Sequence, residues 1–335
     1  MSAVRLLVLS ILVAVLLFLP VFVRNFFYMH LIIMMGVNTI LAMTFLMLLN
    51  TGLLSIGVAG FWGIGAYAST LLVMELGISF WVALPLAAVI TGVIALCIGP
   101  IMVKMAGIVF AILTMVVNMI VVQLVGHMEL FGGWGGIIGI AAPGRIHLPF
   151  LPPVSFATKI PYYYLIMFLL LVTAAAFHTL YNSRIGRNWR AIRQTPHLAE
   201  SVGINLFKYR LLAFVVSSSF SGLAGSFYAH YFQSIEPATF DVFKSVYIQL
   251  YAVLGGLSFL ILGPAIGAII WTVVPELLSD FQEYVPLATG AILILLICFL
   301  REGLLSLPQE FQQWLRGRRR AIAPTRAFSD FAKEK

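Results

Sequence analysis

The chain alternates between long uncharged apolar stretches and short polar segments. A helix needs roughly 20 apolar residues to cross the hydrocarbon core of a bilayer, and a half-helix buried in protein needs fewer. The stretches lie at residues 6–23, 27–48, 52–74, 80–103, 108–126, 161–181, 211–232, 246–274 and 286–300. They predict an all-α fold, a polytopic transmembrane helical bundle with about 8–10 spans that include broken or re-entrant helices.

Two positions along this pattern are interrupted. The stretch 246–274 contains Gly255-Gly256 and Gly263-Pro264, so we expect two short helices there, either a re-entrant pair or two tight crossings. A second break falls at Asn50-Thr51-Gly52, between two apolar stretches. Broken helices expose backbone polar groups, and membrane proteins tolerate these only where they are buried in protein or line a wet cavity. We therefore expect both breaks to lie inside the bundle.

Composition excludes the soluble classes of protein. Hydrophobic residues make up 61% of the 335 residues and charged residues 10%, against roughly 45–50% and about 25% in soluble domains. A soluble domain of this length cannot bury so much apolar surface. The mean hydropathy of +1.04 agrees.

Lys and Arg residues gather on one side of the predicted membrane. Counting crossings outward from the basic segment 182–210 places sixteen of the twenty Lys and Arg residues on that side, together with both termini. Cytoplasmic loops carry an excess of Lys and Arg, so we expect this side to be cytoplasmic. The predicted organisation is a transmembrane permease domain over 1–305, with the cytoplasmic loop 182–210, and a basic interfacial tail over 306–335 that rests on the lipid membrane.

The chain lacks the short motifs of several catalytic and nucleotide-binding classes. It contains no G-x-x-x-x-G-K-[ST], H-E-x-x-H or G-x-S-x-G sequence, so we expect no catalytic residues, no bound metal and no cofactor on this chain. No Asp, Glu, Lys or Arg falls inside a predicted span, which disfavours a proton-coupled carrier. An ion-coupled secondary transporter remains an alternative, because backbone carbonyls can coordinate sodium. The net charge of +8 follows the membrane topology, so no nucleic-acid partner is expected.

The cytoplasmic loop contains the pattern of one short helix. Thr195 suits an N-cap, Pro196 the first helical position and Gly203 the stop. Between them stand His197, Leu198, Ala199, Glu200, Ser201 and Val202, of which Leu198, Ala199 and Val202 would form an apolar stripe. So short a helix is unstable alone in water and needs a surface. That surface is either the membrane and the ends of the chain's own helices or a groove on a partner, and Arg190 and Arg193 would then tune its orientation.

Several segments together resemble one transporter family. They are Gly186-Arg187-Asn188-Trp189-Arg190-Ala191-Ile192-Arg193, Ala199-Glu200-Ser201-Val202-Gly203-Ile204-Asn205, Asn50-Thr51-Gly52-Leu53-Leu54-Ser55-Ile56-Gly57, Phe61-Trp62-Gly63-Ile64-Gly65-Ala66-Tyr67, Gly132-Gly133-Trp134-Gly135-Gly136-Ile137 and Arg301-Glu302-Gly303-Leu304. The combination is similar to the M-type permease subunit of branched-chain amino-acid ABC transporters and covers roughly residues 30–305.

The resemblance implies a set of partners and a solute. They are a homologous second permease subunit, two cytoplasmic ATP-binding subunits that carry ATP and Mg²⁺, and an extracytoplasmic solute-binding protein, in a prokaryotic plasma (inner) membrane. The implied solutes are branched-chain or other hydrophobic amino acids, with urea or a short amide as the alternative. The short cytoplasmic helix would then dock on an ATP-binding subunit.

A solute that crosses between helices needs polar groups along its route. Candidates are the polar residues inside the predicted spans or at their breaks: Asn38, Asn50, Ser55, Asn118, Gln123 and Gln249. Each could instead bond a neighbouring helix, which is worth only about 0.6 kcal/mol on average in membranes.

Overall fold

The computed structural model describes residues 25–105, 107–144, 156–257 and 259–277, together with Pro20 and Gly290. The predicted first and last spans and the tail 306–335 lie outside these residues. The long helices are α2 (Phe26–Leu49), α3 (Val58–Met74), α4 (Phe80–Met102), α5 (Ile108–His127), α6 (Lys159–Asn182), α9 (Leu206–Phe232), α10 (Val242–Gly255) and α11 (Leu262–Leu277). Shorter elements are α7 (Arg184–Gln194), α8 (Pro196–Ser201), the 3-10 turns η1 (Glu129–Phe131), η2 (Gly133–Gly135) and η3 (Pro237–Phe240), and strands β1 (Ile137–Ile138) and β2 (Ser234–Ile235).

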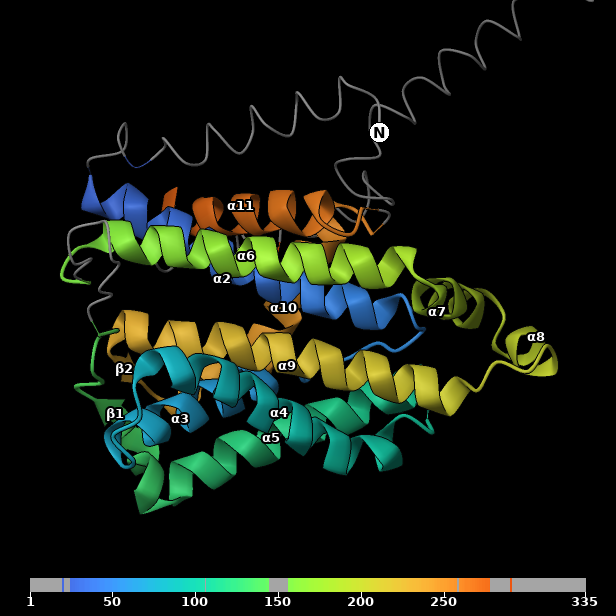
Figure 1. Ribbon diagram of the computed structural model, residues 1–335, viewed down its shortest axis with the longest axis horizontal. Coiled ribbons are helices and arrows are strands. Elements are labelled where there is room, and N and C mark those ends of the chain that lie inside the picture. The colour runs from blue at the N-terminus through green and yellow to red at the C-terminus, as the bar shows by residue number, and fades with distance from the viewer. Residues whose placement is uncertain are drawn as a thin grey trace, which may run out of the picture.

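The long helices lie side by side in one bundle (Figure 1). Helices α2, α4, α5, α6 and α9 are each long and apolar enough to cross a membrane, and α3, α10 and α11 are shorter apolar helices. The predicted polytopic helical bundle is therefore confirmed. One end of the bundle carries β1 and β2, and we call it the strand end; the other carries α7 and α8, and we call it the basic end (Figure 1).

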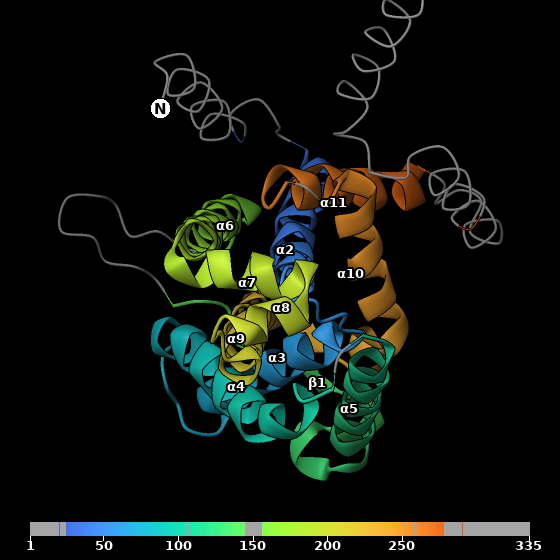
Figure 2. The same cartoon turned by 90° about the vertical axis from the view of Figure 1, so that its right-hand side faces the viewer.

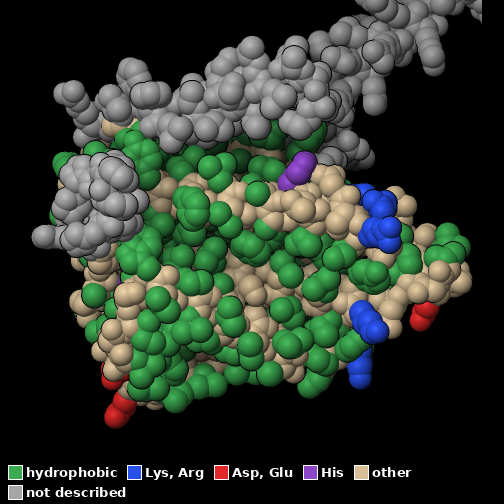
Figure 3. Space-filling model, in the orientation of Figure 1, with side chains coloured by type: hydrophobic (Ala, Val, Ile, Leu, Met, Phe, Trp, Pro, Cys, Tyr) green, Lys and Arg blue, Asp and Glu red, His purple; other side chains and the backbone are tan. Residues whose placement is uncertain are grey.

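The sides of the bundle are apolar and its ends are charged (Figure 3). Large apolar side chains cover the flanks, for example Val89, Val93 and Leu96 on α4, each at least half exposed. In the same view Lys and Arg side chains gather at the basic end. This belt between charged ends is the surface that a bilayer covers.

Glycines bring the central helices into close contact. A Cβ atom placed at Gly65 of α3 would overlap the backbone of Gly222 on α9, and one at Gly225 would overlap the carbonyl of Trp62. Gly222 also faces the side chain of Thr91 on α4. Small residues allow such close crossings, which supply the packing that holds helices together in lipid. Helices α3, α4 and α9 are therefore packed closely together, with one flank of α4 left exposed.

Both predicted breaks are present. The stretch 246–274 forms the two helices α10 and α11, and the backbones of Gly255 and Gly263 touch where the chain turns back. At this turn Gly256 has φ = +113°, a conformation that favours glycine. Figure 2 looks along α6 and α9 but shows α10 from the side, so α10 crosses the bundle obliquely. The other break leaves residues 50–57 outside any helix, between α2 and α3.

The strand end is closed by a small ladder that the hydrophobic pattern did not predict. Ile137 pairs with Ile235 and Ile138 with Ser234 in an antiparallel arrangement. Beneath the ladder, Nδ1 of the buried His230 donates to the carbonyl of Ala141 at 2.8 Å, and its Nε2 accepts from the hydroxyl of Ser69 at 2.8 Å. The glycine-rich segment after α5 is thus fastened to α9.

Candidate functional site

The predicted short cytoplasmic helix exists as α8 at the basic end, where it projects beyond the ends of the long helices (Figure 1). Thr195 occupies the N-cap position and Pro196 the first turn, although the Thr195 side chain makes no capping hydrogen bond. The helix ends at Ser201 with Val202 in the C-cap position, and the N–H of Gly203 (φ = +87°) bonds to the carbonyl of Glu200 at 2.9 Å. The predicted start and end of the short helix are therefore confirmed, but the predicted cap by the Thr195 hydroxyl is not formed.

The predicted apolar stripe of α8 is split between two faces. Ala199 is buried at 3% exposure, whereas Leu198 is 62% and Val202 70% exposed. His197 and Glu200 are exposed as well. The helix therefore rests on the protein through Ala199 and presents two aliphatic side chains outward.

Helix α7, which precedes α8, is fixed to the bundle through three polar contacts. The buried Trp189 donates from Nε1 to the carbonyl of Tyr209 on α9 at 2.9 Å. Arg190 donates to the carbonyl of Tyr181 at 3.0 Å, and its guanidinium lies 4.5 Å from the centre of the Tyr181 ring. Arg193 donates to Oδ1 of Asn50 at 2.6 Å. These bonds connect α7 to α9, to α6 and to the end of α2; a part for Arg190 or Arg193 in docking a partner stays a prediction.

The second group of candidate residues lies where α3 begins. Helix α3 starts beside the middle of α5, because Gly57 packs against Thr114 and Gly60 against Asn118. One backbone N–H just before the helix and one in its first turn bond to side-chain oxygens: Ile56 to Thr114 Oγ1 at 2.9 Å and Ala59 to Ser245 Oγ at 2.9 Å. The N-terminus of α3 is therefore buried at half depth and satisfied by hydroxyl groups from other helices.

The N-terminus of α10 meets that of α3. Asp241 caps α10 by accepting the N–H of Val242 at 2.6 Å, and Ser245 in the next turn reaches Ala59. One turn further, Gln249 donates to the carbonyl of Ser55 at 3.3 Å. Lys244, half-buried, stands in the same first turn of α10. Two helix N-termini, each with a partial positive charge, thus converge with one lysine inside the bundle.

Unpartnered polar atoms surround this meeting point. Asn118 donates from Nδ2 to the carbonyl of Phe240 at 3.2 Å, but its Oδ1 has no hydrogen-bond partner among the described residues. The indole N–H of Trp62 and the hydroxyl of Tyr67 are also buried, and neither has a hydrogen-bond partner among the described residues. All three residues contact Phe240, whose ring lies 4.8 Å from that of Trp62 and 5.9 Å from that of Tyr67. We call Trp62, Tyr67, Asn118 and Phe240 the polar–aromatic cluster.

The structure brings together three of the six predicted pathway residues. Ser55, Asn118 and Gln249 lie around the junction of α3 and α10. Asn38 donates instead to Thr272 on α11 at 3.0 Å, and Asn50 bonds to Arg193 at the basic end. Gln123 lies exposed on α5.

The expectation that the membrane-spanning helices contain no charged residue needs correction. Helix α10 begins at Val242 and includes Lys244, and α9 begins at Leu206 and includes Lys208 and Arg210. The uncharged stretches started after these residues, since a hydropathy pattern ends a span at its first charge. Capping residues carry the missing information: Asp241 and Asn205 both cap their helices.

A bundle of helices long and apolar enough to cross a membrane identifies a polytopic membrane protein. A profile of the family described as "Branched-chain amino acid transport system / permease component" matches residues 27–300. The chain belongs to this family, and its role as a membrane permease component follows.

Individual relatives agree with the family assignment. The permease protein LivM of the high-affinity branched-chain amino acid transport system of Salmonella typhimurium is 29% identical over 296 residues, which cover 82% of this chain and 67% of that protein. LivM of Escherichia coli is 28% identical over the same shares of both chains. The probable branched-chain amino acid transport permease LivH of Methanocaldococcus jannaschii is 25% identical over 65% of this chain and 69% of its own. No solved structure matches the chain significantly.

Proposed function

We propose that this permease subunit of an ABC importer passes branched-chain or other hydrophobic amino acids along the junction of α3 and α10. The observation that carries the proposal is the convergence of two buried helix N-termini at Ala59 and Ser245. Discontinuous helices with this arrangement bind the anionic groups of solutes in other transporter folds. The names of the relatives supply the solute class.

A carboxylate fits the N-terminal junction. Backbone N–H groups at a helix start bond readily to anions, and the helix dipole favours negative charge there. In the present conformation the hydroxyl of Ser245 accepts from the N–H of Ala59, so a carboxylate oxygen can take its place without leaving the amide unpaired. Lys244 adds one full positive charge in the same turn.

We assign the ammonium group of the solute to the other side of the junction. Oδ1 of Asn118 is buried without a partner and can accept its hydrogen bond. Trp62 and Phe240 offer apolar surface to an aliphatic side chain. The turn η3, which ends at Phe240, connects the strand end to α10, and we expect Phe240 to move when a solute enters from that end.

The proposal extends to the partners. Helix α8 docks through Leu198 and Val202 on one of two cytoplasmic ATP-binding subunits, which hold ATP and Mg²⁺ and catalyse its hydrolysis, while this chain contributes no catalytic step. A homologous second permease and an extracytoplasmic solute-binding protein complete the importer. The basic end then faces the cytoplasm of a prokaryotic cell, and the protein lies in its plasma (inner) membrane.

The test is uptake of labelled leucine by the complete transporter in ATP-loaded proteoliposomes. Lys244→Gln should weaken the apparent affinity for leucine by about tenfold, the effect of losing one hydrogen bond to a charged group. Ser245→Ala removes the hydroxyl that competes for the Ala59 N–H and should strengthen the affinity. Lys159→Gln, at the start of α6, is the matched control and should transport normally. Normal leucine uptake by both junction variants would overturn the proposed route.

Two alternatives give different results in the same vesicles. Urea has no carboxylate, so if urea or a short amide is the solute, Lys244→Gln leaves its uptake unchanged and leucine is not carried. If the chain is an ion-coupled carrier, the purified chain alone transports leucine under a sodium gradient without ATP.

A further inference from the structure

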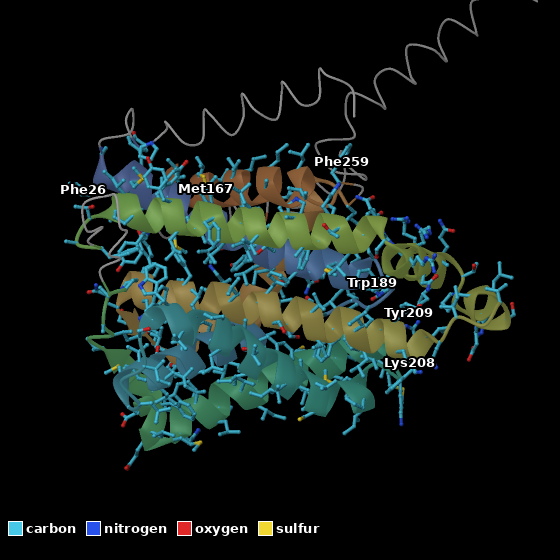
Figure 4. All side chains as sticks on the ribbon, in the orientation of Figure 1. Phe26, Met167, Trp189, Lys208, Tyr209 and Phe259 are labelled. Atoms are coloured by element: carbon cyan, nitrogen blue, oxygen red, sulfur yellow. The ribbon has the colours of Figure 1, made fainter. Side chains whose placement is uncertain are left out.

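A pocket of about 570 Å³ opens at the basic end beside the first turn of α9. Val103 and Lys104, which follow α4, form one wall. The connection from α8 to α9 forms another, and Leu206, Phe207 and Arg210 of α9 complete the pocket. Figure 4 labels Lys208 and Tyr209, which mark this turn.

Arg210 is the unusual side chain of this pocket. It is only 7% exposed, and its Nε has no hydrogen-bond partner among the described residues. Burial of a cationic group is costly unless anions compensate it. Within the chain the charge of Glu200 acts on Arg210, while the Nε donor stays unbonded. Arg210 therefore keeps one donor that a negatively charged group in the pocket can use.

The rest of the lining favours an anion as well. Lys104 brings a second cation. Asn205 accepts the N–H of Lys208 at 3.0 Å, which leaves the amides of Leu206 and Phe207 as the first-turn donors that line the pocket. Glu200 is the acidic side chain of the lining. Two cations and the N-terminus of the 27-residue helix α9 therefore outweigh one carboxylate in the pocket.

The position of the pocket identifies the source of the anion. The pocket lies at the ends of α4 and α9, two helices long enough to cross the membrane, and therefore at the depth of lipid headgroups. Apolar side chains lie exposed beside it, with Ile101 at 73%, Met105 at 50% and Phe207 at 37%. Helix α8, which contains Leu198, projects beyond the ends of the long helices (Figure 1), and we assign Leu198 to the ATP-binding subunit.

We propose that this pocket binds the phosphate group of an anionic phospholipid, with the acyl chains lying along the exposed flank of α4. Arg210 and Lys104 bond to the phosphate oxygens, and the amides of Leu206 and Phe207 face it. Glu200 opposes the anion and limits its affinity. This site does not depend on the proposed solute route.

The experiment measures lipid binding to the purified full chain in detergent. Fluorescent dioleoyl phosphatidylglycerol is titrated onto delipidated protein, with dioleoyl phosphatidylcholine as the neutral comparison. Lys104→Gln and Arg210→Gln should each weaken phosphatidylglycerol binding about fivefold, the effect of one cation on an anionic lipid. Glu200→Gln should tighten it. Lys208→Gln, an exposed cation in the same turn that does not line the pocket, is the control and should bind normally.

Each outcome decides the proposal. If Arg210→Gln fails to fold, the opposite effects of Lys104→Gln and Glu200→Gln carry the test. Equal phosphatidylglycerol binding by all variants overturns the site. If inorganic phosphate binds but does not compete with phosphatidylglycerol, the ligand of the pocket is a free phosphate, and the lipid proposal is overturned. A third outcome also overturns the proposal: the pocket binds no lipid, and Lys104→Gln prevents assembly with the ATP-binding subunit. The anion would then be a carboxylate of that subunit.

Discussion

A single side-chain contact joins the basic end to the first helix break. Arg193 on α7 donates to Asn50, the residue at which α2 ends and the non-helical segment 50–57 begins. Gly52 in this segment also lies against the backbone of Arg193. A displacement of α7 therefore acts directly on the chain that leads to the N-terminus of α3.

We predict that Arg193→Gln and Asn50→Ala are energetically coupled. The bond joins an exposed arginine to a buried amide, so its contribution is about 1 kcal/mol, below that of a fully buried charged bond. The double variant should lose less stability than the sum of the single variants, measured by thermal unfolding in detergent. In the complete transporter both single variants should retain ATP hydrolysis and lose transport.

Arg187→Gln is the control for this pair, since Arg187 is exposed on the same helix and is not part of the contact. Strict additivity of the two single changes, with normal transport, would show that the contact has no role in coupling.

The candidate junction was only partly predictable at the scale of residues. Ser55, Asn118 and Gln249 could be selected because each is a polar residue within or beside an apolar stretch. Ser245 and Lys244 could not, because they precede the stretch that begins at residue 246 and look like loop residues. Their importance depends on segment 233–241 turning back into the bundle, and no local pattern encodes the depth that a connection reaches.

At the scale of elements, apolar stretches gave the helix positions to within a few residues. The start of α9 was placed late, at residue 211, because Lys208 and Arg210 broke the uncharged stretch. The oblique course of α10 and the ladder of β1 with β2 were not predictable, since both depend on contacts between segments far apart in sequence. Glycine pairs at the end of α10 did predict its turn.

Helix α8 is an element whose function can be tested by one side chain. Leu198→Asp places a charge on an exposed apolar position, so the chain should fold normally and lose its ATP-binding subunit. Burial of an aliphatic chain of this size contributes roughly 1.5–3 kcal/mol, enough to weaken assembly at least tenfold. Assembly is measured by co-purification and by solute-stimulated ATP hydrolysis in nanodiscs.

Leu198→Met keeps the apolar surface and should assemble as the unaltered protein does. Normal assembly and normal stimulation in Leu198→Asp would remove α8 from the coupling surface.

The whole molecule has a charge asymmetry along the bundle. The described cations of α7, Lys104 and those of the first turn of α9 gather at one end, whereas Glu75, Glu129 and Glu236 belong to segments at the other. From the positive-inside rule we predict that the basic end faces the cytoplasm.

Cysteine labelling tests this orientation. In a chain with Cys97 and Cys298 replaced by alanine, Ser201→Cys on α8 should react with an impermeant maleimide only in inside-out vesicles. Thr158→Cys, exposed before α6, should react only in right-side-out cells. The reverse pattern would invert the molecule and refute both the docking of α8 and the cytoplasmic lipid site.

The edge-to-face contacts of Phe240 with Trp62 and Tyr67 have a consequence for the resting membrane if the solute follows the proposed route. A hydrated ion needs continuous water, and a constriction closed by aromatic rings stays dewetted. A cell that maintains about 100 mV across this membrane stores roughly 2.3 kcal/mol per elementary charge, and every ion that leaks through dissipates it. An amino-acid zwitterion carries no net charge and does no work against that voltage. On the proposed route, these aromatic contacts would let an amino acid pass without discharging the membrane.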